Sequence, residues 1–329
     1  MHMSVKEVET LFGTTMYEYA HRRSARRILR AGRRLNIPES IENVLTFVNL
    51  NAHPLGVAVA KYGSQRRSLS AFEGVTPEVL RRLYKIPDDR VATNETNLQC
   101  VPEFFDENWS RGDLDAFYST NNLSIPPRVV QKGTRANDDT KPSSEASLDL
   151  QYISGMAPNA TTIVWNMNGT NPFSSIDEPF FEWGQQILDE DHPPFVISIS
   201  YSDDEQHIFQ SSEAYARSFD NLLMKMGTRG ISVLMSSGDD GVAGQRPDVS
   251  KLGANERCLH NGPQWPTGSP FITAVGATML LPQDGTDQFF WTPNEVACSG
   301  SHGGMITVGG GFANQYGIPP VFRDRAELH

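Results

Sequence analysis

The second half of the chain alternates short apolar runs with helical stretches, and this alternation limits the fold more than any other feature. From about residue 140, four apolar runs are typical of strands: TTIVWN (161–166), FVISISYS (195–202), ISVLMSSG (231–238) and FITAVGATML (271–280). Helical patterns cover residues 180–188 and 211–226. Apolar strands that alternate with helices indicate a parallel sheet covered on both faces. The sequence therefore predicts an α/β fold.

The first 75 residues follow another pattern. Residues 4–12 predict a short amphipathic helix, residues 16–19 a strand, and residues 41–50 a further short element. Residues 51–74 show no period and contain the dibasic pair Arg66-Arg67, so we interpret them as a linker. A helix begins after Thr76, with Pro77 at its first position. We therefore predict three parts, residues 1–50, 51–74 and 75–329.

Charge is unevenly distributed along the 329 residues. The net charge is −11, yet residues 1–35 hold eight basic residues against three acidic ones. This basic segment has three interpretations. It is a solvated face, a surface for nucleic acid or anionic lipid, or a segment that docks on the acidic remainder of its own chain. No apolar run is long enough for a transmembrane helix, and the first residues lack the apolar core of a signal peptide. We expect neither a membrane nor a nucleic acid as partner.

Cysteine and asparagine patterns add two weaker indications. The three cysteines are an odd number without metal-ligand spacing, so one is unpaired or has its partner outside this chain. Five Asn-X-Ser/Thr sequons give mild support for a secretory history, at Asn94, Asn108, Asn122, Asn159 and Asn168.

Polar, glycine-bearing loops follow three of the predicted strands. They begin at Asn166, Ser200 and Ser236. Ligands of parallel sheets bind at the carboxyl ends of the strands, so we expect the chemistry there. In the third loop, SSGDDG, the glycines at 238 and 241 let the backbone turn sharply beside Asp239. The alternative reading of this loop is an acidic surface turn.

Two carboxylates lie one helical turn apart in PSSEASLDLQY. Like charges at i and i+4 repel, so Glu145 and Asp149 are either a solvated helix face or a partly buried pair that shares a proton. The neighbouring Leu148 and Leu150 favour a mostly buried helix. Carboxyl pairs of that kind carry out acid–base work at low pH.

Five motifs, in this order, resemble one peptidase family. They are SSEASLDLQYISGMAPNATTIVW, SISYSDDEQ, SSGDDG, WPTGSPFITAVGAT and VGGGFANQY. The chain resembles the serine-carboxyl peptidases, the sedolisin family, and within it the lysosomal tripeptidyl peptidase. The resemblance implies a subtilisin-like parallel sheet, preceded by the end of a small α+β propeptide (1–50) and its activation linker (51–74).

The resemblance also implies roles for individual residues. Glu145 corresponds to the general base, Asp149 to the carboxylate that orients it, and Asp239 to the protonated acid of the oxyanion hole. Substrate binding is implied for the residues that end the second and third predicted strands, Ser200, Tyr201, Ser202, Ser237 and Gly238. The acidic run Asp203 to Glu205 is a candidate for attracting a substrate's amino terminus.

One departure from the family pattern is large. The family nucleophile lies in a Ser-Gly-Thr-Ser-type motif after the GGGF loop, and this sequence contains no such motif. The family's calcium-binding segment is missing as well, so we expect no metal in this chain. We therefore predict a catalytic domain that is incomplete at its C-terminus and inactive as given.

The predicted parent is an acid-acting, tripeptidyl-peptidase-like hydrolase of peptides or proteins in a lysosome or an extracellular acidic compartment, with residues 1–50 packing on its catalytic domain. A non-catalytic peptide-binding protein and a basic-arm nucleic-acid binder are the alternatives.

Overall fold

The computed structural model describes residues 4–20, 27–31, 74–94, 96–244, 262–281 and 295–317. The element predicted over 41–50 and nearly all of the predicted linker lie outside these ranges, so the predicted boundaries stay predictions. The chain divides into two compact units, Met1–Ser68 with Gly253–Glu256 and Leu69–Leu252 with Arg257–His329. Each unit is described by itself.

The N-terminal unit begins with the predicted helix and strand. Helix α1 (Val5–Phe12) starts at a capping box in which Ser4 and Glu7 each bind the other's main chain. Strand β1 (Met16–Ala20) pairs antiparallel with β2 (Arg27–Ala31). The helix predicted over 4–12 and the strand predicted over 16–19 are confirmed.

A six-stranded parallel sheet forms the centre of the larger unit. Its order is β10-β8-β6-β3-β5-β4. The strand bounds are Leu98–Glu103 (β3), Arg128–Gly133 (β4), Thr161–Asn166 (β5), Val196–Ile199 (β6), Ser232–Ser236 (β8) and Thr273–Val275 (β10). All pairs within it are parallel, which confirms the predicted sheet, and β5 has its predicted bounds. Strands β3 and β4 were not predicted.

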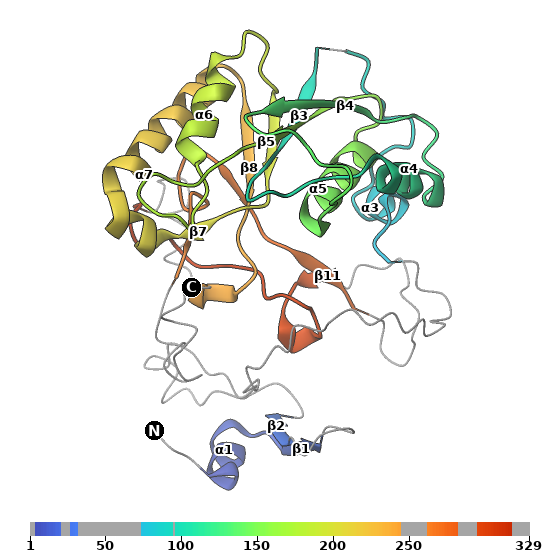
Figure 1. The fold of residues 1–329 in the computed structure, drawn as a ribbon. Coiled ribbons are helices and arrows are strands. Elements are labelled where there is room, and N and C mark those ends of the chain that lie inside the picture. The colour runs from blue at the N-terminus through green and yellow to red at the C-terminus, as the bar shows by residue number, and fades with distance from the viewer. Residues whose placement is uncertain are drawn as a thin grey trace. The chain divides into compact units, whose positions relative to one another are not determined.

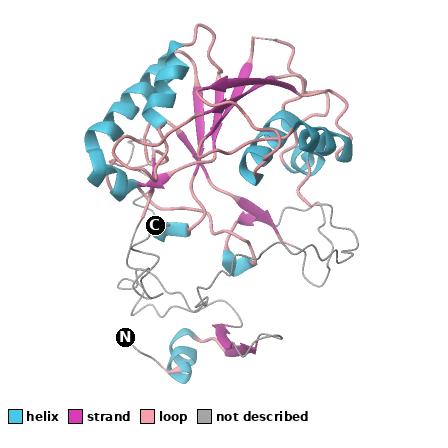
Figure 2. Ribbon diagram, in the orientation of Figure 1, coloured by secondary structure: helices cyan, strands magenta, loops and turns pink. Residues whose placement is uncertain are grey.

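Helices cover the sheet in two groups, as Figure 1 and Figure 2 show. Helices α6 (Phe180–Asp189) and α7 (Glu205–Thr228) pack against each other on one side. On the other side lie α3 (Pro77–Leu83), α4 (Arg111–Thr120) and α5 (Ser144–Met156). Among the described residues, no helix is long and apolar enough to cross a membrane.

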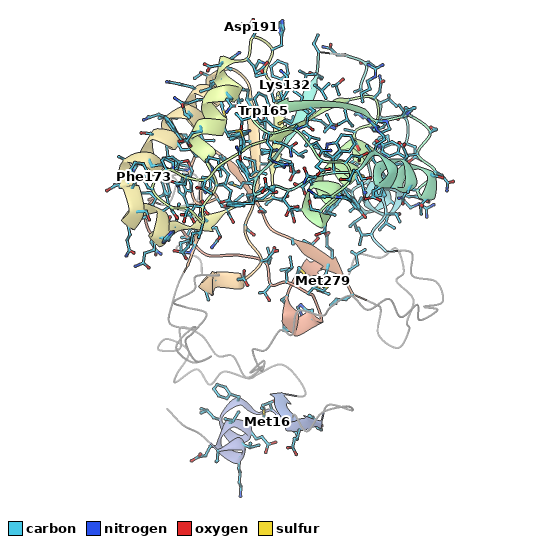
Figure 3. The ribbon with its side chains drawn as sticks, viewed as in Figure 1. Met16, Lys132, Trp165, Phe173, Asp191 and Met279 are labelled. Atoms are coloured by element: carbon cyan, nitrogen blue, oxygen red, sulfur yellow. The ribbon has the colours of Figure 1, made fainter. Side chains whose placement is uncertain are left out.

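Two apolar clusters fill the two layers. The larger contains the fully buried rings of Trp183, Phe219 and Trp265, and the smaller contains Leu150 and Val164. At the sheet edge, the Lys132 ammonium lies 5.6 Å from the ring centroid of Trp165 (Figure 3). These packed layers hold the carboxyl ends of the strands in place.

Helix α7 extends further toward the N-terminus than the predicted 211–226. Its backbone leaves helical geometry at Ser212, where φ is −165°. The Ser212 hydroxyl accepts the amide N–H of Tyr215 and so caps the second helical segment. The sequence pattern therefore identified the longer segment and missed the one that starts at Glu205.

The run FITAVGATML was predicted as one strand, and this prediction is wrong. After β10 the chain turns at Gly276, and β11 (Thr278–Leu280) pairs antiparallel with β12 (Glu295–Ala297) in a separate sheet. A short pair also joins β7 (Asp203–Asp204) to β9 (Gln264–Trp265). Two 3₁₀ turns complete the described elements, Gly241–Ala243 and Gly300–His302.

Helix α5 is only half buried, which corrects the prediction of a mostly buried helix. Leu150 is 1% exposed, but Leu148 is 51% exposed. Ala146 and Leu150 lie at i and i+4 on the buried face. Glu145 and Asp149, each one residue earlier, therefore lie along the border between that face and solvent.

Candidate active site

Helix α5 brings the two predicted carboxylates to the carboxyl end of the sheet. The Ser200 hydroxyl, directly after β6, donates a 2.6 Å hydrogen bond to Asp149 Oδ2. Because β6 and α5 come from separate parts of the chain, this bond fixes Asp149 relative to the sheet. Ser200 therefore holds a carboxylate of the site, a role that the sequence pattern did not assign to it.

Burial raises the pKa of both carboxyl groups of this pair. Desolvation is the main cause that raises the pKa of Asp149 to about 6, and the hydrogen bond from Ser200 opposes it. Desolvation, followed by the charge of Asp149, raises the pKa of Glu145 to about 7. The charges of Glu107 and Asp239 add smaller contributions to this rise.

Two further carboxyl groups of this cluster were missed at the sequence level. Glu103 ends β3, is fully buried and accepts a 2.9 Å hydrogen bond from the Tyr201 hydroxyl. Burial, then the charge of Asp149, raises its pKa. Glu107 follows in the next loop, and its buried Oε2 has no hydrogen-bond partner within the described ranges. Neither residue belongs to a motif with a recognisable spacing, so only the fold reveals them.

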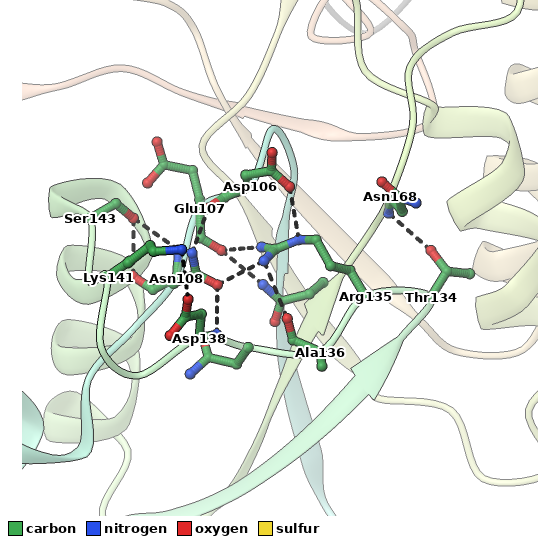
Figure 4. A network of polar contacts seen from close by, with 12 residues as sticks. Asp106, Glu107, Asn108, Thr134, Arg135, Ala136, Asp138, Lys141, Ser143 and Asn168 are labelled. Atoms are coloured by element: carbon green, nitrogen blue, oxygen red, sulfur yellow. Dashed lines mark hydrogen bonds and ion pairs between the residues drawn. The ribbon is translucent and has the colours of Figure 1, made fainter.

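A polar network ties the Glu107 loop to the start of α5 (Figure 4). The Arg135 guanidinium donates to the main-chain oxygen of Glu107 and, at 2.7 Å, to Asn108 Oδ1. The main chain of Asn108 exchanges hydrogen bonds with Ser143, the residue that precedes α5. The network therefore fixes α5 relative to β3. It also buries the side chain of Asn108, which belongs to one of the five sequons.

Asp239 lies in the turn after β8 and lines a cleft of about 610 Å³. Gly238, at φ 88°, has the left-handed backbone that this turn requires. The main-chain oxygen of Asp239 accepts the amide N–H of Thr307 at 2.8 Å. The side chain remains exposed in the cleft.

Four of the five predicted substrate-binding residues line the same cleft, and the fifth does not. Ser200, Tyr201, Ser202 and Gly238 line the 610 Å³ cleft. Ser202 also donates to Gln264 Oε1 at 3.1 Å. Ser237 instead lines two other cavities of about 250 and 310 Å³, and its buried hydroxyl has no hydrogen-bond partner in the described part of the chain.

One end of the cleft is strongly acidic. Asp177, Glu178 and Asp203 are 4%, 5% and 7% exposed and all line it. Burial, the largest cause, raises the pKa of both Glu178 and Asp203, and the two carboxyl groups interact with each other. His207 Nε2 lies 3.1 Å from Asp177 Oδ2 and 3.2 Å from the Ser174 hydroxyl. On the same loop, Phe173 lies against Tyr215 of α7 (Figure 3).

Comparisons with known proteins agree with this architecture. A family model described as "Pro-kumamolisin, activation domain" matches residues 1–55. Aorsin from Aspergillus oryzae is 28% identical, over 97% of this chain and 58% of its own length. Tripeptidyl-peptidase 1 from Pongo abelii is 26% identical, over 96% of this chain and 52% of its own length. The chain is therefore similar to proteins of the sedolisin family over nearly its whole length.

The fold of the chain is also that of a solved sedolisin. Pseudomonas sedolisin, a serine-carboxyl proteinase complexed with two molecules of pseudo-iodotyrostatin, superimposes with a TM-score of 0.55 at 21% identity, over 77% of this chain and 66% of that one. This likeness confirms the predicted subtilisin-like, mostly parallel sheet. The chain spans about half the length of the curated sedolisin relatives.

The metal and cysteine expectations concern separate residues of this chain. Within the described ranges, no group of three or more His, Cys, Asp or Glu residues is placed to hold a metal ion. Cys100 and Cys298 are buried free thiols, and Cys258 lies outside the described residues.

Proposed function

We propose that this chain carries the carboxylate machinery of an acid-acting serine-carboxyl peptidase. The supporting observation is the meeting of three predicted groups at the ends of β6 and β8. Asp149 is bonded to Ser200, Asp149 and Asp239 both act on the pKa of Glu145, and Asp239 lines the cleft. The names of the relatives, which include tripeptidyl-peptidase 1, support the same reaction class.

In this proposal the three carboxyl groups divide the work of acyl transfer. Glu145 takes the proton of a serine hydroxyl as its oxygen attacks the peptide carbonyl, and Asp149 orients Glu145. The protonated carboxyl of Asp239 donates a hydrogen bond to the developing oxyanion. Glu145 then returns the proton to the leaving amine, and water releases the acyl group by the same route. The sequence contains no Ser-Gly-Thr-Ser motif that would identify the serine.

The pair explains an acidic working range. The carboxyl groups of Glu145 and Asp149 titrate at about 7 and about 6, so around pH 6 to 7 they hold one proton and one negative charge. Transfer of the shared proton from Glu145 to Asp149 leaves Glu145 charged, and Glu145 then serves as the base. The proposal also places the enzyme in a lysosome or another acidic compartment. Residues 1–50 would act there as a propeptide on the catalytic domain.

The test uses protein expressed from the complete reading frame. We expect labelling by a fluorophosphonate and faster peptide hydrolysis at pH 5.5 than at pH 8. The labelled serine is then mapped by mass spectrometry. A label on Ser200 would contradict its assignment as the group that holds Asp149. Peptide binding without labelling would replace the proposal with a non-catalytic peptide-binding protein, and neither binding nor labelling would reject both.

The acidic end of the cleft supports a finer proposal, recognition of a substrate's free amino terminus. Glu178 Oε2 and Asp203 Oδ2 are buried and have no hydrogen-bond partner among the residues that the structure describes. Among the described cleft-lining residues, His207 is the one basic side chain, and it already contacts Asp177. An ammonium group would supply both donors and positive charge. Binding of the substrate's amino terminus at this acidic end of the cleft would make the enzyme a tripeptidyl-peptidase-like exopeptidase.

Acetylation of a peptide's amino terminus is expected to weaken its binding at pH 5.5 about tenfold or more, because the acetylated end brings no charge to the acidic residues. Asp203→Asn should remove most of this discrimination. Glu182→Gln is the matched control, since Glu182 binds Tyr215 and does not line the cleft. Equal affinity of the wild type for free and acetylated peptides would show that the enzyme does not read the amino terminus.

A further inference from the structure

The turn that carries Asp239 is held by a second segment of chain. Thr307 N–H donates to the Asp239 oxygen at 2.8 Å, and Gly241 N–H donates to the Thr307 oxygen at 2.8 Å. Gly309 N–H donates to the Gly238 oxygen at 2.9 Å. A Cβ at Gly309 would lie 1.8 Å from the Ser237 oxygen, so the two segments approach too closely for any side chain there. The position of Asp239 therefore depends on where residues 307–309 lie.

That second segment is anchored in turn by a buried carboxylate. Glu205, at the start of α7, is fully buried. Its Oε2 accepts the main-chain N–H of Asn314 at 2.8 Å and of Gln315 at 3.2 Å. Nearby, a Cβ built at Gly268 lies 2.9 Å from the Ala313 Cβ and 3.3 Å from Glu205 Oε1. The carboxylate thus holds main chain rather than facing the cleft.

Two further residues of α7 grip the same segment. Arg217 donates to the Gln315 oxygen at 3.1 Å, and its guanidinium lies 5.1 Å from the ring centroid of Tyr316. The Tyr316 hydroxyl donates to Asp220 Oδ1 at 3.2 Å. Arg217 is partly exposed, whereas Glu205 is not. The buried carboxylate is therefore the anchor that solvent cannot replace.

We propose that Glu205 is a positioning residue of the candidate site. By holding the main chain of residues 314 and 315, it keeps residues 307–309 paired with the Gly238–Gly241 turn and so keeps Asp239 at the cleft. The structural part of this proposal stands on the hydrogen bonds alone. Its consequence for catalysis rests on the proposed function.

Two features of the Glu205 side chain determine the choice of variants. The two N–H groups converge on one oxygen, which the amide oxygen of glutamine also supplies. Burial raises the pKa of Glu205, so an uncharged acceptor is compatible with this position. Glu205→Gln should therefore preserve the anchor, and Glu205→Leu should remove it. Glu213→Leu is the matched control on the same helix, because Glu213 pairs with Arg217 and is exposed.

The test measures amide hydrogen exchange in protein from the complete reading frame. In Glu205→Leu we expect residues 305–312 and 238–242 to exchange about tenfold faster or more, with β6 and the second half of α7 unchanged. Glu205→Gln and Glu213→Leu should match the wild type. If Glu205→Leu does not fold, Arg217→Ala loosens the anchor from its exposed side and should accelerate the same two segments to a smaller degree.

The kinetics of peptide hydrolysis provide a second measurement, which a purely structural role of Glu205 would leave unchanged. A displaced Asp239 should lower kcat about tenfold with KM within twofold, and Glu205→Gln should restore kcat. Unchanged exchange at 305–312 and 238–242 in folded Glu205→Leu would overturn the proposal, as would faster exchange spread over the whole sheet. An exchange result as expected in a protein without peptidase activity would reject the proposed function and keep the anchor.

Discussion

Replacing Glu145 by glutamine is expected to lower kcat for peptide hydrolysis by about 10²–10⁴-fold, because the amide cannot accept the serine proton. Peptide affinity should stay within about twofold, since the acidic end of the cleft is unchanged. The measurement compares kcat and KM of the variant and wild type at pH 5.5, with protein from the complete reading frame.

Glu107→Gln provides the control for this experiment. Glu107 also raises the pKa of Glu145 through its charge. Its removal should move the pH profile slightly toward acid and change kcat by less than about threefold. If Glu107→Gln and Glu145→Gln lost activity equally, the assignment of Glu145 as the base would be wrong.

Raising the pH from 4 to 8 is expected to destabilise the larger unit. A carboxyl group with a raised folded pKa contributes stability that is present at low pH and is lost as pH rises through that pKa. For Asp149 the window runs from about 4, its unfolded value, to about 6, and ionisation costs the folded state about 3 kcal/mol. The raised pKa values of Glu103, Glu178 and Asp203 act in the same direction.

Thermal unfolding followed by circular dichroism measures this effect. For a unit of this size, about 3 kcal/mol corresponds to a fall in Tm of about 6–12 °C between pH 4 and pH 8. Asp149→Asn keeps an acceptor for the Ser200 hydroxyl without the negative charge. Its Tm at pH 8 should therefore be higher than that of the wild type by about 5 °C or more. Asp115→Asn, on the exposed side of α4, should decline like the wild type. A Tm that rises toward pH 8 would contradict this account.

The sequence pattern predicted the parts of the fold that repeat regularly. The run TTIVWN coincides with β5, and the Thr76-Pro77 start coincides with α3. The central strand β3 was missed because Pro102 interrupts its apolar run. The proline is tolerated because β3 pairs with β6 only at Gln99 and Cys100, before Pro102 is reached.

The sequence predicted some residues of the candidate site and missed others. The pair Glu145 and Asp149 has the helical spacing that places both on one face, and Asp239 follows an apolar strand, so both signals are local. Two residues that interact with this pair, Glu103 and Ser200, lie at or directly after the ends of strands that meet it only in the folded chain. Their contribution depends on sheet order, which the sequence pattern alone does not supply.

The most direct test of the central claim, that these carboxyl groups converge and share protons, is the titration of Glu145 by carbon-13 NMR of its labelled carboxyl group. The account predicts a midpoint near pH 7 in the wild type, and a lower midpoint in both Asp149→Asn and Asp239→Asn. A Glu145 carboxyl that titrates near its ordinary value of about 4.3 and does not respond to either substitution would contradict the account.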